Sequence, residues 1–225
     1  KHKPILNFTT HDLTEFSDTL FDAYKNKLLY IEVVRHPLFM IIQQSLNMKN
    51  LINTSRDIDV YYTYKNKEFP YFALGWEKIF DNLNPTEKAI HLMDINTKIN
   101  NRKRNKILKG MYKKNYLTIP FELFVLDPTR YLSQINKKLN TKNTLFTKKF
   151  LKENNVPRKK IADSIPLEIY KRCGWVPPIK GYSERDELKI RRKYVLKKIN
   201  KKYISIIDKL SSEYEKKYLK NILWK

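Results

Sequence analysis

The chain of 225 residues is 41% hydrophobic and 13% aromatic, which excludes a disordered protein and suffices for one domain with a hydrophobic core. Its 46 Lys and Arg against 23 Asp and Glu give a formal charge of +23, which favours anionic partners, although a general lysine bias gives the same total. A single cysteine, Cys173, excludes an internal disulfide and indicates a reducing, cytoplasmic compartment, and no apolar run reaches the roughly 18 residues of a membrane span.

The N-terminal part of the chain predicts a strand, a helix and a second strand. Residues 4–9 and 28–34 (LLYIEVV) are short apolar runs, typical of strands that are buried on both faces. Asp12 or Thr14 caps the helix between them. The apolar stripe of this helix consists of Leu13, Phe16, Leu20 and Tyr24. The strand-helix-strand order indicates that the two strands are parallel.

Turn and helix signals organise the middle of the chain. Residues 38–48 have helical composition, and the polar and then aromatic stretch 49–73 predicts a strand pair or an extended excursion over the sheet. Pro85 suits the first turn of a long helix that runs to about Lys109, where Gly110 stops it.

The C-terminal part is predicted to be helical after a third short strand at residues 116–119. Helical spacing recurs over residues 130–139, 145–154, 184–199 and 203–222. The last of these helices carries a stripe of Tyr203, Ile207, Leu210, Tyr214 and Tyr218. We therefore predict a single α/β domain over residues 1–225, with a central parallel sheet between two layers of helices and a helix-rich C-terminal half.

Two charged side chains follow the first two predicted strands. His11 comes after the first strand and Arg35 directly after the second. Because the carboxyl ends of parallel strands meet at one edge of a sheet, where ligands bind, we expect both side chains at that edge. The His11 imidazole can exchange protons near neutral pH, and the Arg35 guanidinium, which is always charged, can bind phosphate through two N–H groups.

Three segments, in their order along the chain, resemble the sulfotransferase family, P-loop-like enzymes that transfer a sulfuryl group from 3′-phosphoadenosine 5′-phosphosulfate. Residues 10–12 (THD) resemble the Thr-His segment of that family, and residues 34–37 (VRHP) resemble its strand-end Arg-x-Pro segment. Residues 120–128 (PFELFVLDP) resemble its later Tyr-Glu-x-Leu-x-x-x-Pro stretch. Together with a weaker likeness in the C-terminal half, the resemblance covers most of the chain.

The resemblance implies a role for particular residues. His11 would take the proton of the hydroxyl or amine acceptor, and Arg35 would hold the 3′-phosphate of the donor. Phe121 stands where an adenine-contacting Tyr is common, and Gln43 stands where a Ser usually shares the 3′-phosphate. The residues expected to contact the donor are Arg35, Gln43, Ser45, Phe121, Arg158 and Lys159.

The chain also departs from the pattern of the family. Nothing in it resembles the Pro-x-x-Gly-Thr-Thr loop that would hold the 5′-phosphosulfate, so we expect this loop upstream of Lys1 and expect the 225 residues alone to be inactive. No Arg-Lys-Gly followed by Gly-Asp-Trp is present, which makes Arg158 and Lys159 a substitute. The acceptor, a small molecule, carbohydrate or lipid, cannot be read from the sequence.

Two other functions compete with this one. The charge and the long basic helices suit a protein that binds nucleic acid, although such a protein does not need buried strands that end in Arg-x-Pro. A P-loop kinase relative would use the same scaffold for phosphoryl transfer.

Several residues are interpreted as structural. His36 is expected in a turn, His91 on the surface and Trp76 in the core. The clusters at residues 102–104 and 191–193 are expected on solvated helix faces. No spacing of His and Cys indicates a metal site, so we predict none.

Overall fold

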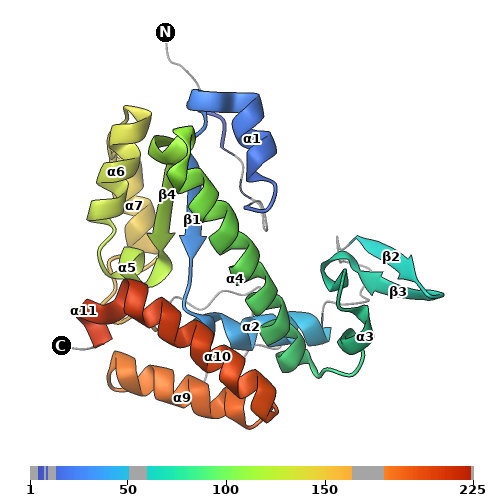
Figure 1. Ribbon diagram of the computed structural model, residues 1–225. Helices are drawn as coiled ribbons and strands as arrows, with labels where there is room; N and C mark the ends of the chain where they lie inside the picture. The colour runs from blue at the N-terminus through green and yellow to red at the C-terminus, as the bar shows by residue number, and fades with distance from the viewer. Residues whose placement is uncertain (1–4, 8, 10–13, 51–59, 164–179, 224–225) are drawn as a thin grey trace. The chain divides into compact units, whose positions relative to one another are not determined.

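The computed structural model describes residues 5–7, 9, 14–50, 60–163 and 180–223 (Figure 1). It is a mostly helical α/β structure with one small parallel and one small antiparallel sheet, each of two strands. The chain divides into two compact units, residues 1–32 with 95–118, and residues 33–94 with 119–225. Within the described residues the parallel sheet has two strands, so the three-layer sheet predicted from the sequence is not seen there.

The parallel sheet pairs β1 (Tyr30–Val34) with β4 (Tyr116–Pro120), whose arrows point the same way in Figure 1. The strands predicted at residues 28–34 and 116–119 are thus confirmed. The expectation that β1 is buried on both faces is wrong, because its side chains alternate between buried and accessible. Val33 is 61% exposed, whereas Glu32 is 7% exposed and faces helix α4 through Arg104. Because only one face of β1 is covered, buried side chains alternate with accessible ones along the strand instead of forming a continuous buried run.

The predicted first strand is not formed by the described residues 5–7 and 9. Ile5 and Leu6 are exposed, by 56% and 75%, because no neighbouring strand covers them. The parallel partner of β1 is therefore β4, which follows much later in the chain, and the β-α-β unit predicted for residues 4–34 is not present in this part.

The first unit packs its aromatic residues around helix α1 (Ser17–Tyr24) and the short 3-10 helices η1 (Lys25–Lys27) and η3 (Met111–Asn115). Its core is Phe21, Tyr30, Ile107 and Tyr116. The apolar stripe predicted for α1 is wrong, since Phe16 and Tyr24 are exposed by 62% and 43%. Instead, Ser17 donates its hydroxyl to the Thr14 carbonyl at 2.8 Å, and this turn directs Ser17 and Phe21 inward.

Helix α4 (Pro85–Lys109) has the bounds that the sequence predicts, because its end signals are local. Asn84 accepts hydrogen bonds from the Thr86 and Glu87 amides, and the Glu87 carboxylate accepts one from the Asn84 amide at 3.2 Å. This reciprocal cap fixes the start of the helix. At the other end, Gly110 leaves the helix in an extended conformation.

The core of the second unit lies among α2 (Pro37–Asn50), α9 (Glu184–Leu196) and α10 (Lys201–Tyr214). The predicted stripe of Tyr203, Ile207, Leu210 and Tyr214 is confirmed as buried. After it, the π-helical turn η4 (Glu215–Leu219) leads into α11 (Lys220–Leu223). The wider π-helical turn contains one residue more than an α-helical turn, which shifts the buried positions along the chain by one. Leu219 is therefore fully buried, in place of Tyr218, which the sequence predicted on the buried stripe.

The remaining elements of the second unit are shorter. Strands β2 (Tyr61–Tyr64) and β3 (Lys67–Pro70) form an antiparallel hairpin, which confirms the strand pair predicted within residues 49–73; residues 51–59 lie outside the described part. The other short elements are η2 (Tyr71–Ala73), α3 (Glu77–Phe80), α5 (Phe121–Leu126), α6 (Thr129–Leu139) and α7 (Leu145–Glu153). Among the described helices, none has the length and apolarity needed to traverse a bilayer.

Candidate anion-binding site

An arginine and an aromatic ring meet where the two parallel strands end. Arg35 follows β1 and Phe121 follows β4. The guanidinium carbon of Arg35 lies 4.7 Å from the centroid of the Phe121 ring, within the range of a cation–π contact. The contact belongs to the second unit and stands at the edge of the sheet where the sequence predicted a phosphate-binding side chain.

A second arginine contacts the same ring. The guanidinium carbon of Arg158 lies 5.6 Å from the Phe121 centroid, and the Arg158 amide donates to the Val125 carbonyl at 2.7 Å. Nη1 of Arg158 donates to the Ile161 carbonyl at 3.1 Å, whereas its Nε is buried and has no hydrogen-bond partner within the described residues. A buried N–H without an acceptor is costly, so this group is suited to a ligand oxygen.

The two guanidinium groups act on one another electrostatically. Burial lowers the pKa of Arg158 most, and the positive charge of Arg35 lowers it further. Two like charges beside one ring raise the local positive potential. An anion with several oxygens would relieve this repulsion, and the planar fork of arginine matches phosphate or sulfate.

A buried histidine fixes the chain beside Arg35. His36 is fully buried, and its Nδ1 accepts a hydrogen bond from the Leu38 amide at 3.1 Å. The proton of the neutral ring must therefore lie on Nε2, which donates to the Glu215 carboxylate at 3.1 Å. The sequence expected His36 in a turn; the side chain also caps the first turn of α2 and ties it to η4.

A buried carboxylate joins the two strand ends. Glu122, beside Phe121, is fully buried and accepts a hydrogen bond from the His36 amide at 3.0 Å. It also accepts one from the Tyr214 hydroxyl. Burial, followed by the charge of Glu122, raises the pKa of Tyr214, so this hydroxyl keeps its proton and remains a donor. Glu122 thus holds the backbone next to Arg35 in register with the backbone next to Phe121.

The other residues predicted to contact the donor are Gln43, Ser45 and Lys159. Gln43 and Ser45 lie on α2, and the Ser45 hydroxyl donates to the Ile41 carbonyl at 2.6 Å within that helix. Lys159 is exposed beside Arg158. Of the residues expected to bind the donor, the ring contacts join Arg35, Phe121 and Arg158. His11 lies outside the described residues, as does Cys173.

Sequence reasoning missed the buried residues that support this site. Glu122 lies within the segment that resembles the sulfotransferases, and its acidic side chain in an otherwise apolar run was an unused signal. Tyr214 was assigned to the core as one of a stripe, and nothing in that spacing distinguishes a tyrosine that donates to a buried carboxylate.

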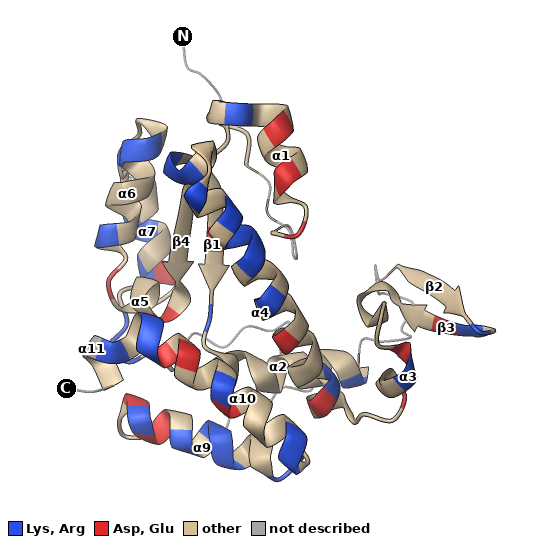
Figure 2. Cartoon of the chain, viewed as in Figure 1, with Lys and Arg blue, Asp and Glu red and all other residues tan. Residues whose placement is uncertain are grey.

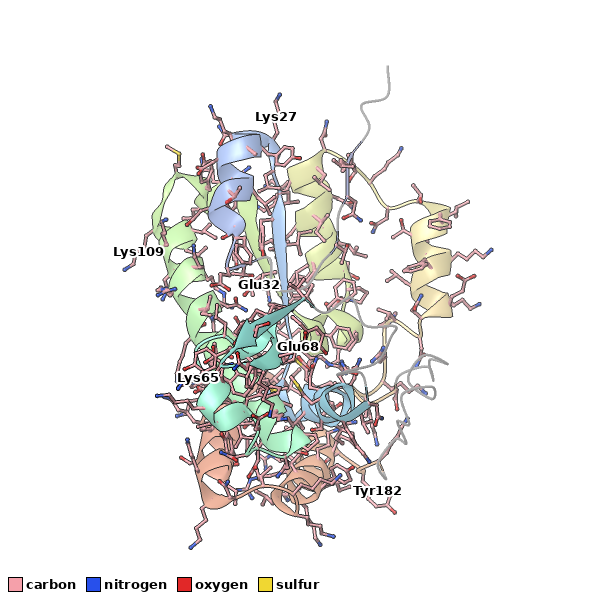
Figure 3. All side chains as sticks on the ribbon, turned by 90° about the vertical axis from the view of Figure 1, so that its right-hand side faces the viewer. Lys27, Glu32, Lys65, Glu68, Lys109 and Tyr182 are labelled. Carbon is pink, nitrogen blue, oxygen red and sulfur yellow. The ribbon has the colours of Figure 1, made fainter. Side chains whose placement is uncertain are left out.

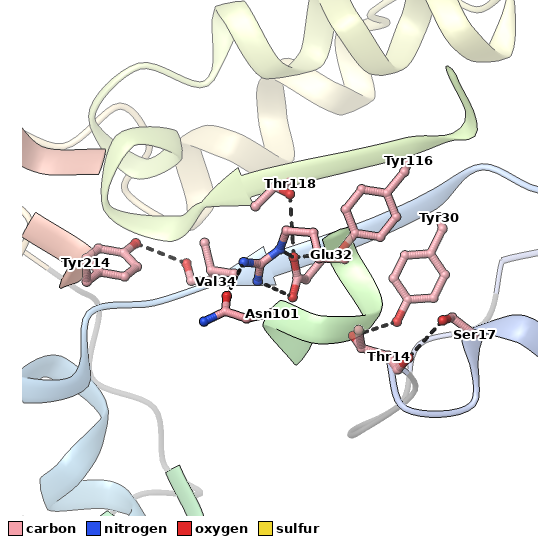
Figure 4. A network of polar contacts seen from close by, with 10 residues as sticks. Thr14, Ser17, Tyr30, Glu32, Val34, Asn101, Tyr116, Thr118 and Tyr214 are labelled. Atoms are coloured by element: carbon pink, nitrogen blue, oxygen red, sulfur yellow. Dashed lines mark hydrogen bonds and ion pairs between the residues drawn. The ribbon is translucent and has the colours of Figure 1, made fainter. Parts of the chain in front are cut away.

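The first unit contains a separate buried ion pair (Figure 4). Arg104 donates from Nε and Nη2 to the two carboxylate oxygens of Glu32, at 2.7 and 2.6 Å, and the Tyr116 hydroxyl donates to the same carboxylate at 2.7 Å. The expectation that residues 102–104 are solvated is wrong for Arg104, which is 7% exposed because the charge of Glu32 holds it inward.

Two further interpretations from the sequence need correction. Arg191 is buried against the Phe39 ring and pairs with Glu187 at 2.7 Å, so the cluster at residues 191–193 is not wholly solvated. His91 is half-buried, because its ring lies 4.6 Å from that of Trp76, which is in the core as predicted.

The remaining charges are dispersed. Figure 2 shows Lys and Arg spread over α4, α6, α7, α9 and α10, where they alternate in part with acidic residues. Among the described residues no group of three or more His, Cys, Asp or Glu side chains could hold a metal ion.

Comparisons with known proteins give no relative for this chain: no family model, no curated protein and no solved structure matches it.

Proposed function

We propose that the pair Arg35 and Arg158, held on the Phe121 ring, binds the 3′-phosphate of 3′-phosphoadenosine 5′-phosphosulfate, and that the protein is a sulfotransferase. The carrying observation is that residues from three segments, each expected from the sequence at the donor, contact one another at a single ring.

The proposed chemistry assigns different tasks to the residues. The two guanidinium groups neutralise and orient the 3′-phosphate, and the Phe121 ring orients both guanidinium groups. Stacking of Phe121 on the adenine of the donor stays a prediction. His11 takes the proton of the acceptor hydroxyl or amine as that atom bonds to sulfur and the sulfur–oxygen bond to the departing phosphate breaks. We further propose that β1 and β4 belong to a larger, three-layer parallel sheet of the P-loop-like kind.

Calorimetric titration of the 225-residue chain with adenosine 3′,5′-bisphosphate tests this proposal. We expect Arg35→Ala and Arg158→Ala each to weaken binding by about 10- to 100-fold, since each removes a charge-assisted contact of about 1.5–3 kcal/mol. Adenosine 5′-monophosphate, which lacks the 3′-phosphate, should bind the wild type and both variants equally.

Arg130→Ala is the matched control. Arg130 is an exposed arginine of α6 whose guanidinium carbon lies 5.9 Å from the Tyr131 centroid, so the variant removes the same charge and a similar ring contact elsewhere. Equal affinity of the wild type, Arg35→Ala and Arg158→Ala for the bisphosphate would disprove the site.

The assignment of His11 has its own test. His11→Ala should leave affinity for the bisphosphate within about twofold, because the base contacts the acceptor and not the 3′-phosphate. In protein that carries sulfotransferase activity the same substitution should abolish transfer. An active His11→Ala variant would remove this role without affecting the phosphate site.

A further inference from the structure

Helix α7 leaves its large apolar side chains exposed. Leu145, Phe146 and Phe150 are accessible by 84%, 74% and 55%, and no described residue of the helix is buried. In Figure 3, which is turned from the view of Figure 1, α7 stands at the right-hand edge, apart from α6. The helix packs through the half-buried Thr147 and Leu151, and leaves most of its aromatic surface uncovered.

The helix is nevertheless well defined by local interactions. Thr144 caps its first turn, where the Thr147 amide donates to the Thr144 hydroxyl and the Thr144 amide donates to the Thr147 hydroxyl. Phe146 and Phe150, one helical turn apart, have ring centroids 6.3 Å apart with nearly parallel planes. The two rings therefore form one contiguous, accessible apolar face on the helix.

Lysines border this apolar face. Lys148 and Lys152 occupy the side of the helix away from the two phenylalanines, Lys149 lies at the edge of the aromatic face, and all three are exposed. Glu153 is the one acidic residue in the sequence of α7, and its carboxylate lies 3.9 Å from the Lys149 ammonium group. The helix thus has its two phenylalanines on one side, with Lys149 and Glu153 beside them, and Lys148 and Lys152 on the opposite side, so that its side chains carry a net positive charge.

We propose that α7 docks on the surface of an anionic phospholipid bilayer. Lysine stems can extend to the phosphate groups while the phenylalanines enter the boundary between headgroups and acyl chains, the arrangement of interfacial helices. A protruding, convex helix suits a deformable surface, whereas duplex nucleic acid would engage the lysines and leave the phenylalanines in water. Docking of this kind lies along the bilayer and does not traverse it.

Co-sedimentation of the 225-residue chain with vesicles tests the proposal. We expect binding to vesicles of phosphatidylcholine with about 30% phosphatidylserine, and at least about tenfold weaker binding to phosphatidylcholine alone. The double variant Phe146→Ser/Phe150→Ser should lower the partition coefficient by at least about tenfold. Replacing Lys148, Lys149 and Lys152 by Gln should lower it by about fivefold for each lysine and weaken its dependence on salt.

Control substitutions of the same kind come from other exposed positions. Tyr182, labelled in Figure 3, is 94% exposed, and Tyr182→Ser removes an accessible aromatic ring elsewhere. Replacing Lys201, Lys209 and Lys216 by Gln removes three exposed charges outside α7. Both controls should bind vesicles as the wild type does. All of these side chains are exposed, so the variants should keep the circular dichroism spectrum of the wild type.

Two results would overturn the proposal. If the α7 lysine variant and the control lysine variant lose binding equally, the attraction comes from total charge and not from this helix. If Phe146→Ser/Phe150→Ser leaves vesicle binding unchanged but converts an oligomer to a monomer in light scattering, the apolar face is covered by a second copy of the chain.

Discussion

The two units each bury a glutamate beside the parallel strands, but they satisfy it in different ways. In the first unit, Glu32 pairs with both nitrogens of the Arg104 fork, so negative and positive charge neutralise one another. In the second, Glu122 accepts from the His36 amide and the Tyr214 hydroxyl, which are neutral groups, while Arg35, which follows β1, and Arg158, which follows α7, contact the Phe121 ring.

This difference separates a structural ion pair from a candidate ligand site. A guanidinium whose fork is matched by a buried carboxylate has its charge compensated within the fold. Two guanidinium groups beside one aromatic ring, where the charge of Arg35 lowers the pKa of Arg158, give a local positive potential that favours an anion. The pattern of partners, more than the presence of arginine, distinguishes the two regions.

The largest expected effect comes from breaking the pair in the first unit. Glu32→Leu should lower the free energy of unfolding by about 3–5 kcal/mol, because it leaves the charge of Arg104 buried without its carboxylate. The double variant Glu32→Leu/Arg104→Met should recover most of this loss. Urea denaturation followed by circular dichroism measures both.

An exposed pair supplies the control for that prediction. Arg192 and Asp208 form a bidentate ion pair, in which Nε and Nη2 of Arg192 donate to the two carboxylate oxygens at 2.8 and 2.6 Å. Their side chains are 45% and 41% exposed. Arg192→Met should therefore cost no more than about 1 kcal/mol. An equally small loss in Glu32→Leu would show that burial does not set the strength of the Glu32 pair.

A smaller effect is expected at the neutral donors of the second unit. Tyr214→Phe should cost about 1.5–3 kcal/mol, since it removes a hydrogen bond to the buried Glu122 carboxylate. Tyr203→Phe is the matched control, because the Tyr203 hydroxyl is buried without a hydrogen-bond partner among the described residues, and its removal should be neutral or stabilising. Equal losses in the two variants, measured by urea denaturation, would contradict the role of Tyr214.

The smallest effect concerns a surface cluster of the first unit. Hydrogen bonds from Lys103 and then Lys106 lower the pKa of Asp18 below its ordinary value. The stabilisation from these contacts is present above the pKa of the unfolded chain and is lost as the pH falls through the lower pKa of the folded state. Asp18→Asn should therefore cost less than about 1 kcal/mol at pH 7, since the carboxylate is partly exposed.

Acid and salt distinguish this contribution from a packing effect. The stability difference between the wild type and Asp18→Asn should shrink toward zero when the pH is lowered below about 4, and also in about 1 M salt, which screens exposed charges. A difference that stays constant across both series would mean that Asp18 acts through its shape rather than its charge.

Local signals were enough to predict some elements from the sequence. The bounds of α4 follow from Asn84, Pro85 and Gly110, each of which acts within one turn of the helix. The stripe of α10 was predicted up to Tyr214, where the π turn changed the register. The hairpin between Tyr61 and Pro70 is one of the two alternatives that the aromatic composition of residues 49–73 left open.

What the sequence did not reveal depends on partners far along the chain. Arg104 is buried because of Glu32, and Tyr214 is a donor because of Glu122, 92 residues away. Periodicity reports which face of an element is apolar, but it carries no information on which polar group will meet which. Arg35, Phe121 and Arg158 were assigned to one site on resemblance, whereas Glu122, which the matched segment includes, was given no role because the segment does not reveal its partners His36 and Tyr214.

The pairing of Glu32 also has a consequence for the order in which the protein folds during translation. Arg104 is made 72 residues after Glu32, and Tyr116 is made 84 residues after it. Until both have left the ribosome, the carboxylate on the nascent chain keeps its water, and β1 cannot complete its buried face. Residues 95–118, the second segment of the first unit, are therefore synthesised late. A ribosome that stalls before it releases Tyr116 leaves the Glu32 carboxylate without the partners that complete this unit.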